Sequence, residues 1–420
     1  MHSRRQFWAY WDDTHPALFD AFAKNGTVLL VFTVRDDLCS RCKPMTRVFS
    51  AGWACSFPGQ SAVPGTLVAN PKGPVNTILV ECRIPGPLRN KTDLSVRETL
   101  SVSYREAGAA AHHYKDVPYC RYPAPGHEAL TRGAHPARGA TEQAAGPGRA
   151  RVPLAACTML KSNLTRYGVR NSDLLVEWIE YHRLQGVGHF LVYAHEDPAP
   201  LRRLLAPHIA AGLATVVDWE PPPYRGRYTH RGADFVPFQY LQTTSCLHRY
   251  RGLAEWVGLF DIDEFMQPLA IGATVRSAVF TAAAAADASG DDVAALKVAG
   301  VYFFERDGRR WGNSSLLTQR HLKRDRKWRF EVSKCFGRPE RIQLYQQHFP
   351  ILGGAVVELD PVREIRFNHY RDTRFDAAQD DSMGQYRAAL EASVARARRL
   401  RLRQAAERAL PPSGSLVFRR

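Results

Sequence analysis

The pattern of hydrophobic residues divides the chain near residue 150. In the first part, short hydrophobic runs are separated by Pro and Gly, which is typical of β-strands joined by turns. These runs predict strands at residues 27–34, 62–68, 77–83 and 100–104. The chain therefore begins with a small β-rich region, which we place at residues 1–105.

Residues 106–152 consist mainly of Ala, Gly, Pro, Arg and His without hydrophobic periodicity, so we expect a linker there. Beyond it, at residues 153–395, hydrophobic strands alternate with helices. The strands are predicted at residues 154–160, 189–193, 213–219 and 255–260, and the helices at residues 173–185, 199–211 and 235–250. This alternation predicts an α/β fold with a mostly parallel sheet that helices cover on both faces.

The net charge of the 420-residue chain is +16. Such an excess suits an anionic partner, such as nucleic acid, an acidic polysaccharide or phosphorylated small molecules, but it does not choose between them. Many of the Arg residues lie in a predicted helix at 385–409, and residues 396–420 form a basic C-terminal helix and tail. A nucleic-acid-binding protein is therefore one alternative. The sequence motifs of the second part of the chain favour it less than an enzyme.

Two carboxylates, Asp261 and Asp263, directly follow the hydrophobic run 257–260. In extended backbone, residues i and i+2 point to the same side, so the two side chains can converge on one ligand. In parallel sheets, ligands bind at the carboxyl ends of the strands. Oxygen ligands of this kind suit Mg²⁺ or Mn²⁺ held together with substrate phosphates. On a solvated loop the same pair would carry little weight, and its position favours a metal site.

Five further side chains are candidates because of their type and surroundings. Lys334 lies among hydrophobic residues, where a cation could bind phosphate. His348 and His369 also have hydrophobic neighbours, and each is either a structural histidine or a third ligand for Mn²⁺. Asp380 and Asp381 precede a predicted helix, where carboxylates often act only as caps, although a general base would also be a carboxylate.

Several motifs follow one another in the second part of the chain. They are 176–182 (VEWIEYH), 186–190 (GVGHF), 246–250 (CLHRY), 256–265 (WVGLFDIDEF), 333–340 (SKCFGRPE), His348 and 369–371 (HYR). In their order and approximate spacing, residues 154–395 resemble glycosyltransferase family 92, which includes plant galactan synthases and animal β-galactosyltransferases. The joint pattern is far more specific than any one motif.

The resemblance implies a GT-A fold, a Rossmann-like sheet that binds a nucleotide sugar, and an inverting transfer of a hexose onto a glycan or polysaccharide acceptor. It implies UDP-galactose as the donor and Mn²⁺ as the cofactor, held by Asp261, Asp263 and His369. The side chains expected at the donor are Glu177, His182, Lys334 and Arg338. Asp380 or Asp381 is expected to take the proton of the acceptor hydroxyl.

The β-rich region resembles the family more weakly. The stretches 53–57 (WACSF) and 80–85 (VECRIP) are similar to the region that precedes the catalytic part in plant members, where it is thought to bind carbohydrate. The composition break at 106–152 predicts that residues 1–105 are dispensable for the chemistry and are needed for polymer recognition.

Cysteines and sequons favour the secretory pathway. Five of the eight Cys lie in the first 120 residues, where disulfides are favoured over a zinc site built on Cys39 and Cys42. Four N-x-S/T sequons begin at Asn25, Asn90, Asn163 and Asn313. The start of the chain does not read as a signal peptide, and the membrane anchor expected from the family is not visible. We nevertheless expect a membrane-associated Golgi protein with a lumenal catalytic domain.

A carbohydrate-binding protein without catalysis is the second alternative. The side chains expected to hold the metal and the diphosphate are all present, which argues against it. They are Asp261, Asp263, Lys334 and His369. The sequence therefore favours a metal-dependent hexosyltransferase.

Overall fold

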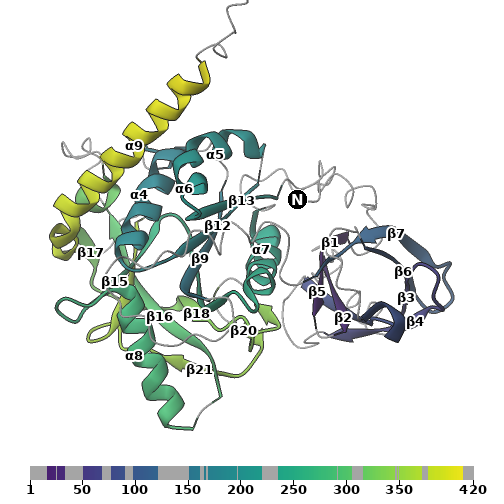
Figure 1. The fold of residues 1–420 in the computed structure, drawn as a ribbon. Helices are drawn as coiled ribbons and strands as arrows, with labels where there is room; N and C mark the ends of the chain where they lie inside the picture. The colour runs from purple at the N-terminus through teal and green to yellow at the C-terminus, as the bar shows by residue number, and fades with distance from the viewer. Residues whose placement is uncertain are drawn as a thin grey trace, which may run out of the picture.

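The computed structural model is a mixed α/β protein built on two β-sheets (Figure 1). It describes residues 17–24, 26–33, 51–68, 77–89, 98–121, 151–160, 165–166, 169–195, 197–219, 235–290, 292–304, 316–345, 348, 350–370 and 377–409. The four sequon asparagines, the Cys39 and Cys42 pair, most of the predicted linker and the C-terminal tail lie outside these residues.

The N-terminal sheet has eight strands in the order β7-β6-β3-β4-β5-β2-β1-β8, and all of its pairings are antiparallel except β1 with β8. The strands are β1 (Ala17–Lys24), β2 (Thr27–Thr33), β3 (Gly52–Ser56), β4 (Val63–Val68), β5 (Thr77–Arg83), β6 (Thr99–Arg105), β7 (His112–Pro118) and β8 (Cys120–Arg121). A short helix, α2 (Gly86–Arg89), follows β5. The four strands predicted in this region are present. Because β7 and β8 belong to the sheet, the linker cannot begin at residue 106 as predicted.

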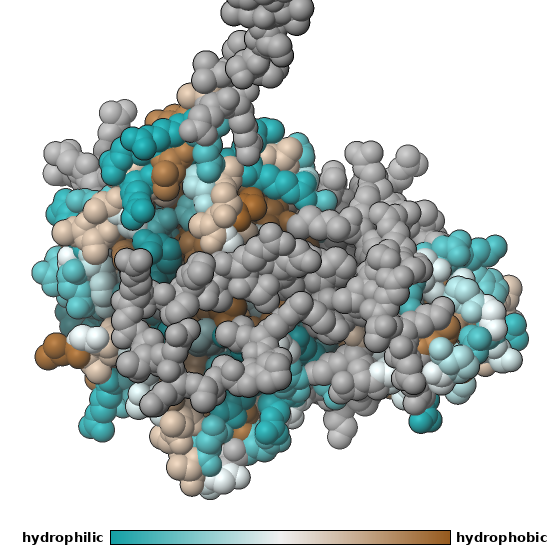
Figure 2. Space-filling model, viewed as in Figure 1, coloured by the Kyte–Doolittle hydropathy of each residue, from teal (hydrophilic) through white to brown (hydrophobic). Residues whose placement is uncertain are grey.

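Aromatic side chains fill the core of this sheet. Trp53 packs against Phe32 and Tyr104 with ring centroids 5.0 and 4.7 Å apart. The Cys55–Cys82 disulfide joins β3 to β5, as expected for the cysteines of this region. In the described part of the sheet, every Phe, Tyr and Trp side chain that the structure places is buried. The outer surface of the sheet is mainly hydrophilic to intermediate in the view of Figure 2. The aromatic side chains that are placed in this sheet therefore form no exposed platform for a sugar ring.

The second sheet has eleven strands, of which eight follow the order β13-β12-β9-β14-β18-β16-β17-β23. They are β9 (Val152–Leu160), β12 (His189–Ala194), β13 (Ala214–Asp218), β14 (Ala254–Leu259), β16 (Val293–Phe304), β17 (Lys323–Asp325), β18 (Arg329–Gly337) and β23 (Ala377–Gln379). The other three are β15 (Glu264–Pro268), β21 (Ala355–Glu358) and β22 (Ile365–Tyr370). The four predicted strands are β9, β12, β13 and β14, and they are parallel to one another, as expected.

Helices cover both faces of these parallel strands, which explains why the strands are continuous hydrophobic runs. On β9, Leu154 and Ala156 share a core with α4 (Asn171–Leu184), whereas Ala155 and Cys157 share one with α7 (Phe235–Tyr250). The remaining helices are α5 (Pro198–Leu204), α6 (Ala206–Ala210), α8 (Val275–Ala288) and α9 (Arg387–Ala409), with 3-10 turns at Leu317–Gln319 and Ser382–Tyr386. Two small ladders pair Thr165–Arg166 with Val169–Arg170 and Leu344–Tyr345 with Pro350–Leu352.

One predicted helix is in fact two. Residues 199–211 form α5 and α6, which are separated at Leu205. Pro207 lies in the first turn of α6, where its missing N–H group costs nothing, whereas inside one continuous helix it would break a hydrogen bond. The helix prediction at 385–409 is met by α9, which packs on α4 and α6.

The two sheets share a hydrophobic core through α7, which lies between them in Figure 1. Phe22, Leu29, Val31 and Leu79 of the N-terminal sheet are buried in the same cluster as Leu247 and other residues of α7. Polar contacts reinforce this packing, because Asp20 accepts hydrogen bonds from Ser245 at 2.8 Å and Arg249 at 2.7 Å. A disulfide between Cys157 and Cys246 ties the other side of α7 to β9.

Because of this shared core, we expect that a chain beginning at Arg151 is insoluble or inactive. The four N-terminal side chains in the cluster are at most 8% exposed, and burial of each contributes about 1.5–3 kcal/mol. The measurement is soluble yield together with turnover of a UDP-sugar by the shortened and the full-length chains. A soluble shortened chain with full turnover would restore the prediction that residues 1–105 are dispensable for chemistry.

Candidate active site

The candidate site lies where β14 ends and the chain turns into β15. Gly258 allows this turn to pack tightly, since a Cβ atom there would lie 2.1 Å from the ring of Phe260. Asp261 follows at the carboxyl edge of the parallel strands, and its side chain is 21% exposed. Asp263 and Glu264 come next and are buried. The sequence prediction that two carboxylates follow a buried strand is therefore met.

Lys334 is placed among these carboxylates by β18, which pairs antiparallel with β14. Its ammonium group lies 3.0 Å from Asp261 Oδ2 and 3.2 Å from Glu264 Oε2, although the side chain is only 2% exposed. Burial alone would lower the pKa of Lys334, but the carboxylates of Asp261 and Glu264 outweigh burial and raise it. The lysine is therefore charged at neutral pH.

His369 enters the site from β22, whose pairing with β15 places it opposite Glu264. Its Nε2 lies 3.7 Å from Asp263 Oδ2, and its Nδ1 lies 3.6 Å from Glu264 Oε1. The Nδ1 atom is buried and makes no hydrogen bond to the described residues. His348 is close enough to Lys334 and Asp261 to interact electrostatically with both. Its burial and the positive charge of Lys334 together lower its pKa. The structure thus brings Asp261, Asp263, Lys334 and His369 together.

The donor types in this cluster fit a divalent cation. Within the described part of the chain, no three His, Cys, Asp or Glu side chains are arranged so that they alone could hold a metal ion. Asp263 and His369 do form a close pair through Nε2 of the histidine, and Nδ1, which faces Glu264, is buried and has no hydrogen-bond partner among the described residues. Carboxylate and imidazole suit Mn²⁺, and one or two carboxylates completed by substrate phosphates are a common arrangement for such cations.

Sequence reasoning missed two residues of the cluster. Glu264 accepts the backbone N–H of Asp261 at 2.8 Å, and burial raises its pKa. Its position directly after the D-x-D pair was the available signal. Gln239 of α7 donates its side-chain amide to Asp261 Oδ1, and no sequence pattern singled it out.

Three of the residues expected at the donor lie elsewhere. Arg338 sits over Trp256, at the end of β14 opposite Asp261, and its guanidinium pairs with Asp287 of α8. Arg338 therefore links α8 to the sheet, and these contacts lie away from the carboxylate cluster.

Glu177 and His182 are both buried in α4. Glu177 accepts hydrogen bonds from the backbone of Leu317 at 2.7 Å and Thr318 at 3.0 Å, so it fixes the start of a 3-10 turn. His182 accepts the N–H of Met266 at 3.2 Å, and burial lowers its pKa to about 3. These contacts are internal to the fold, so of the four residues expected at the donor only Lys334 lies at the cluster.

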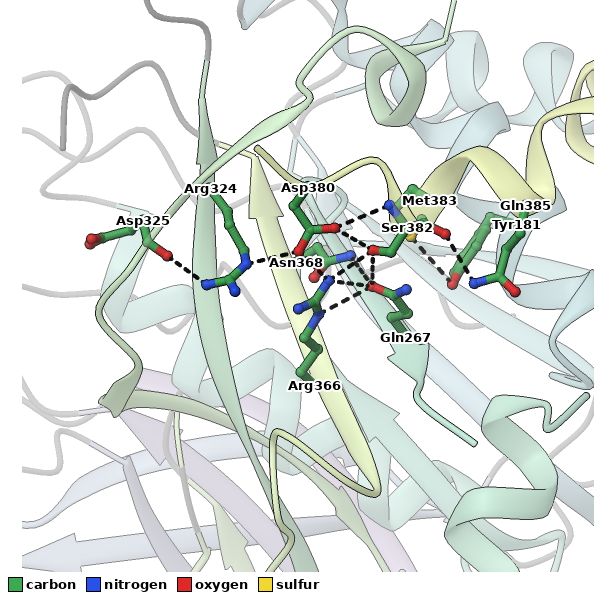
Figure 3. A network of polar contacts seen from close by, with 10 residues as sticks. All are labelled: Tyr181, Gln267, Arg324, Asp325, Arg366, Asn368, Asp380, Ser382, Met383 and Gln385. Atoms are coloured by element: carbon green, nitrogen blue, oxygen red, sulfur yellow. Dashed lines mark hydrogen bonds and ion pairs between the residues drawn. The ribbon is translucent and has the colours of Figure 1, made fainter. Parts of the chain in front are cut away.

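Asp380 belongs to a separate polar network, shown in Figure 3. It accepts hydrogen bonds from Arg324 at 2.8 Å and Arg366 at 2.9 Å, and Ser382 also donates to it. Burial alone would raise the pKa of Asp380, but Ser382 and Arg366 together lower it. Asp381 is exposed, and its side chain does not cap the following turn.

This network lies along β22 from the cluster. Arg366 is three residues from His369, which corresponds to roughly 10 Å in a strand. In the described part of the chain, neither Asp380 nor Asp381 contacts the carboxylate cluster.

Comparison with known proteins decides the family. A family model, Glycosyltransferase family 92, matches residues 166–402, which is more than half of the chain. The chain belongs to glycosyltransferase family 92. As its name says, this is a family of glycosyltransferases. All residues of the candidate cluster lie within the matched range.

Curated relatives include two galactan β-1,4-galactosyltransferases of Arabidopsis thaliana. One is 26% identical over 49% of this chain and 40% of its own length. Another is 34% identical over 24% of this chain and 18% of its own length. A family 92 protein of Ricinus communis is 26% identical over 52% of this chain and 32% of its own length. The chain thus spans less than half the length of the curated relatives that it matches. Among the described residues, no helix combines the length and hydrophobicity needed to cross a bilayer.

Proposed function

We propose that this family 92 protein transfers galactose from UDP-galactose to a glycan, with inversion at the anomeric carbon. The observation that carries the proposal is the convergence of Asp261, Asp263, Lys334 and His369 at the carboxyl edge of parallel strands. The names of the Arabidopsis relatives support galactose and a glycan acceptor. A parallel sheet covered by helices on both faces supports a GT-A arrangement.

The charge balance of the cluster supports a requirement for a divalent cation. The cluster holds three carboxyl groups, those of Asp261, Asp263 and Glu264, and one ammonium group, that of Lys334, which contacts Asp261 and Glu264. Even with Glu264 protonated, the cluster carries no excess positive charge and would bind a diphosphate poorly. Asp261, Asp263 and His369 would hold the metal, which when bound neutralises negative charge on the diphosphate.

Lys334 contributes a fixed positive charge to the same place. The UDP leaving group gains negative charge as the bond to the sugar breaks, and a cation already in position stabilises this charge without reorganisation. The cation is held by two carboxylates and is shielded from water, so its position is well defined. Glu264 orients Lys334 and the backbone of Asp261 together.

We propose that Asp380 has a structural role and does not act as the general base. Its two arginine partners favour the charged form, and a carboxylate with a lowered pKa is a weak base. The network that it completes joins β17, β22 and the turn at Ser382–Tyr386 (Figure 3).

The test is UDP release from a panel of nucleotide sugars, with Mn²⁺ and with a chelator. We expect the fastest release from UDP-galactose in Mn²⁺ and almost none after chelation. Release that is unchanged by chelation would contradict the metal proposal. Binding of glycans without turnover of any donor would favour a carbohydrate-binding protein instead.

We also propose that the protein works in the Golgi lumen. The Cys55–Cys82 and Cys157–Cys246 disulfides support an oxidising compartment, since such bonds persist there. Protein from the native cell should therefore carry glycans on at least one of the four sequons and keep both disulfides. Reduced cysteines and unmodified sequons would contradict this location.

A further inference from the structure

One carboxylate of the candidate site is held by an element outside the D-x-D turn. Asp261 accepts a hydrogen bond at Oδ1 from the side-chain amide of Gln239 and one at Oδ2 from Lys334. These donors come from α7 and β18, two elements that are far apart in the sequence. With one donor on each oxygen, the carboxylate plane is fixed although the side chain is 21% exposed.

Gln239 is itself held firmly. Its side chain is 5% exposed, and its backbone carbonyl accepts the hydroxyl of Thr243 at 3.1 Å. One turn further along the same helix, the hydroxyl of Thr244 exchanges hydrogen bonds with the backbone of Tyr345 at 3.1 and 3.2 Å. The Cys157–Cys246 disulfide then fastens the helix to β9. The amide of Gln239 therefore has a defined place from which to orient Asp261.

The N-terminal sheet supports this helix from its other side. Asp20 bonds Ser245 and Arg249, and Phe22 stacks on His248 with ring centroids 5.6 Å apart. These contacts lie about two to three turns along α7 from Gln239. The helix thus connects the N-terminal sheet mechanically with one carboxylate of the candidate site.

We propose that Gln239 is a positioning residue that orients Asp261 for the metal and the diphosphate. The inference rests on the proposed function, because it assigns Asp261 a task in donor binding. The amide acts through Asp261 and need not touch the substrate. Replacing a residue that holds a metal ligand in place typically lowers metal affinity or activity by about 10–100-fold.

The test replaces Gln239 by methionine, which keeps the volume of the side chain and removes the donor. We expect weaker UDP binding in Mn²⁺ and turnover lowered by about 10–100-fold. The matched control is Gln242→Met on the same helix, because Gln242 is also buried and its amide nitrogen makes no hydrogen bond to the described residues. Equal losses in both variants would overturn the proposal.

Non-additivity separates a positioning role from a merely structural one. If Gln239 acts through Asp261, Gln239→Met should leave UDP affinity unchanged in an Asp261→Asn background. A further loss there would overturn the proposal. Should Gln239→Met not fold, Gln239→Glu keeps the shape, sets a like charge against Asp261 and should weaken binding at least as much. A wild-type protein that turns over no donor would contradict the proposed function, whereas UDP binding would still report on Gln239.

Discussion

Replacement of Asp263 by asparagine is expected to abolish sugar transfer while the protein stays folded. Asp263 is 2% exposed and lies 3.7 Å from His369, so the change removes a charge from the centre of the cluster without changing its volume. Loss of one carboxylate ligand weakens the hold on a divalent cation, and we expect turnover to fall by at least about 100-fold. UDP release in Mn²⁺ and the thermal unfolding curve are the two measurements.

Asp287→Asn is the matched control for this prediction. It makes the same chemical change at a carboxylate that pairs with Arg338, away from the cluster. Normal turnover is expected, and it would also show that the pairing of Arg338 is unimportant for chemistry. Substantial Mn²⁺-dependent turnover by folded Asp263→Asn would remove Asp263 from the metal site.

Lys334→Met is expected to destabilise the protein as well as to stop turnover. The ammonium group is buried between Asp261 and Glu264, so its removal leaves two carboxylates without their cation. Breaking a buried ion pair in this way costs about 3–5 kcal/mol of unfolding free energy. The sequence alone indicated mainly a loss of donor binding, because it did not show that Lys334 holds the cluster together.

A double variant separates the two roles of Lys334. Adding Glu264→Gln to Lys334→Met removes one uncompensated charge and should recover part of the lost stability, measured by denaturant unfolding. Turnover should stay low, because the positive charge that we propose for the diphosphate is still missing. Recovery of turnover together with stability would mean that Lys334 contributes only to folding.

The parts of the fold that could be predicted are those that leave a local pattern along the sequence. The run 154–160 predicted a strand because helices bury β9 on both faces, and such strands are continuously hydrophobic. Asp261 and Asp263 were predictable for a related reason, since they follow a run of the same kind. Family membership was also predictable, because several motifs keep their order along the chain.

The unpredictable part depends on which elements meet in space. Lys334 reaches Asp261 only because β18 pairs with β14 in one particular register, and Gln239 reaches it only because the first half of α7 lies beside Asp261. Likewise, the sequence places Asp380 near a helix start but does not reveal Arg324 and Arg366 beside it. Contacts between distant segments leave no local pattern.

The sequence of β2 does contain a signal for the shared core. Residues 28–32 of β2 are all hydrophobic. They lack the alternation of hydrophobic and polar residues that is typical of a strand with one solvent-exposed face. Val28, Leu30 and Phe32 point into the core of the N-terminal sheet, whereas Leu29 and Val31 point to α7. A strand buried on both faces needs a second partner, and this pattern predicts the shared core.

The shared core also limits how family members can exchange parts. Natural recombination or engineering that grafts a foreign N-terminal sheet onto the second part of this chain would set new side chains against Leu247 and its neighbours on α7. Tightly packed interiors tolerate volume changes poorly. Successful chimaeras should therefore take the N-terminal sheet, and the face of α7 that packs against it, from the same parent. Homologous sequences should accordingly show paired substitutions between positions such as Leu29 and Leu247.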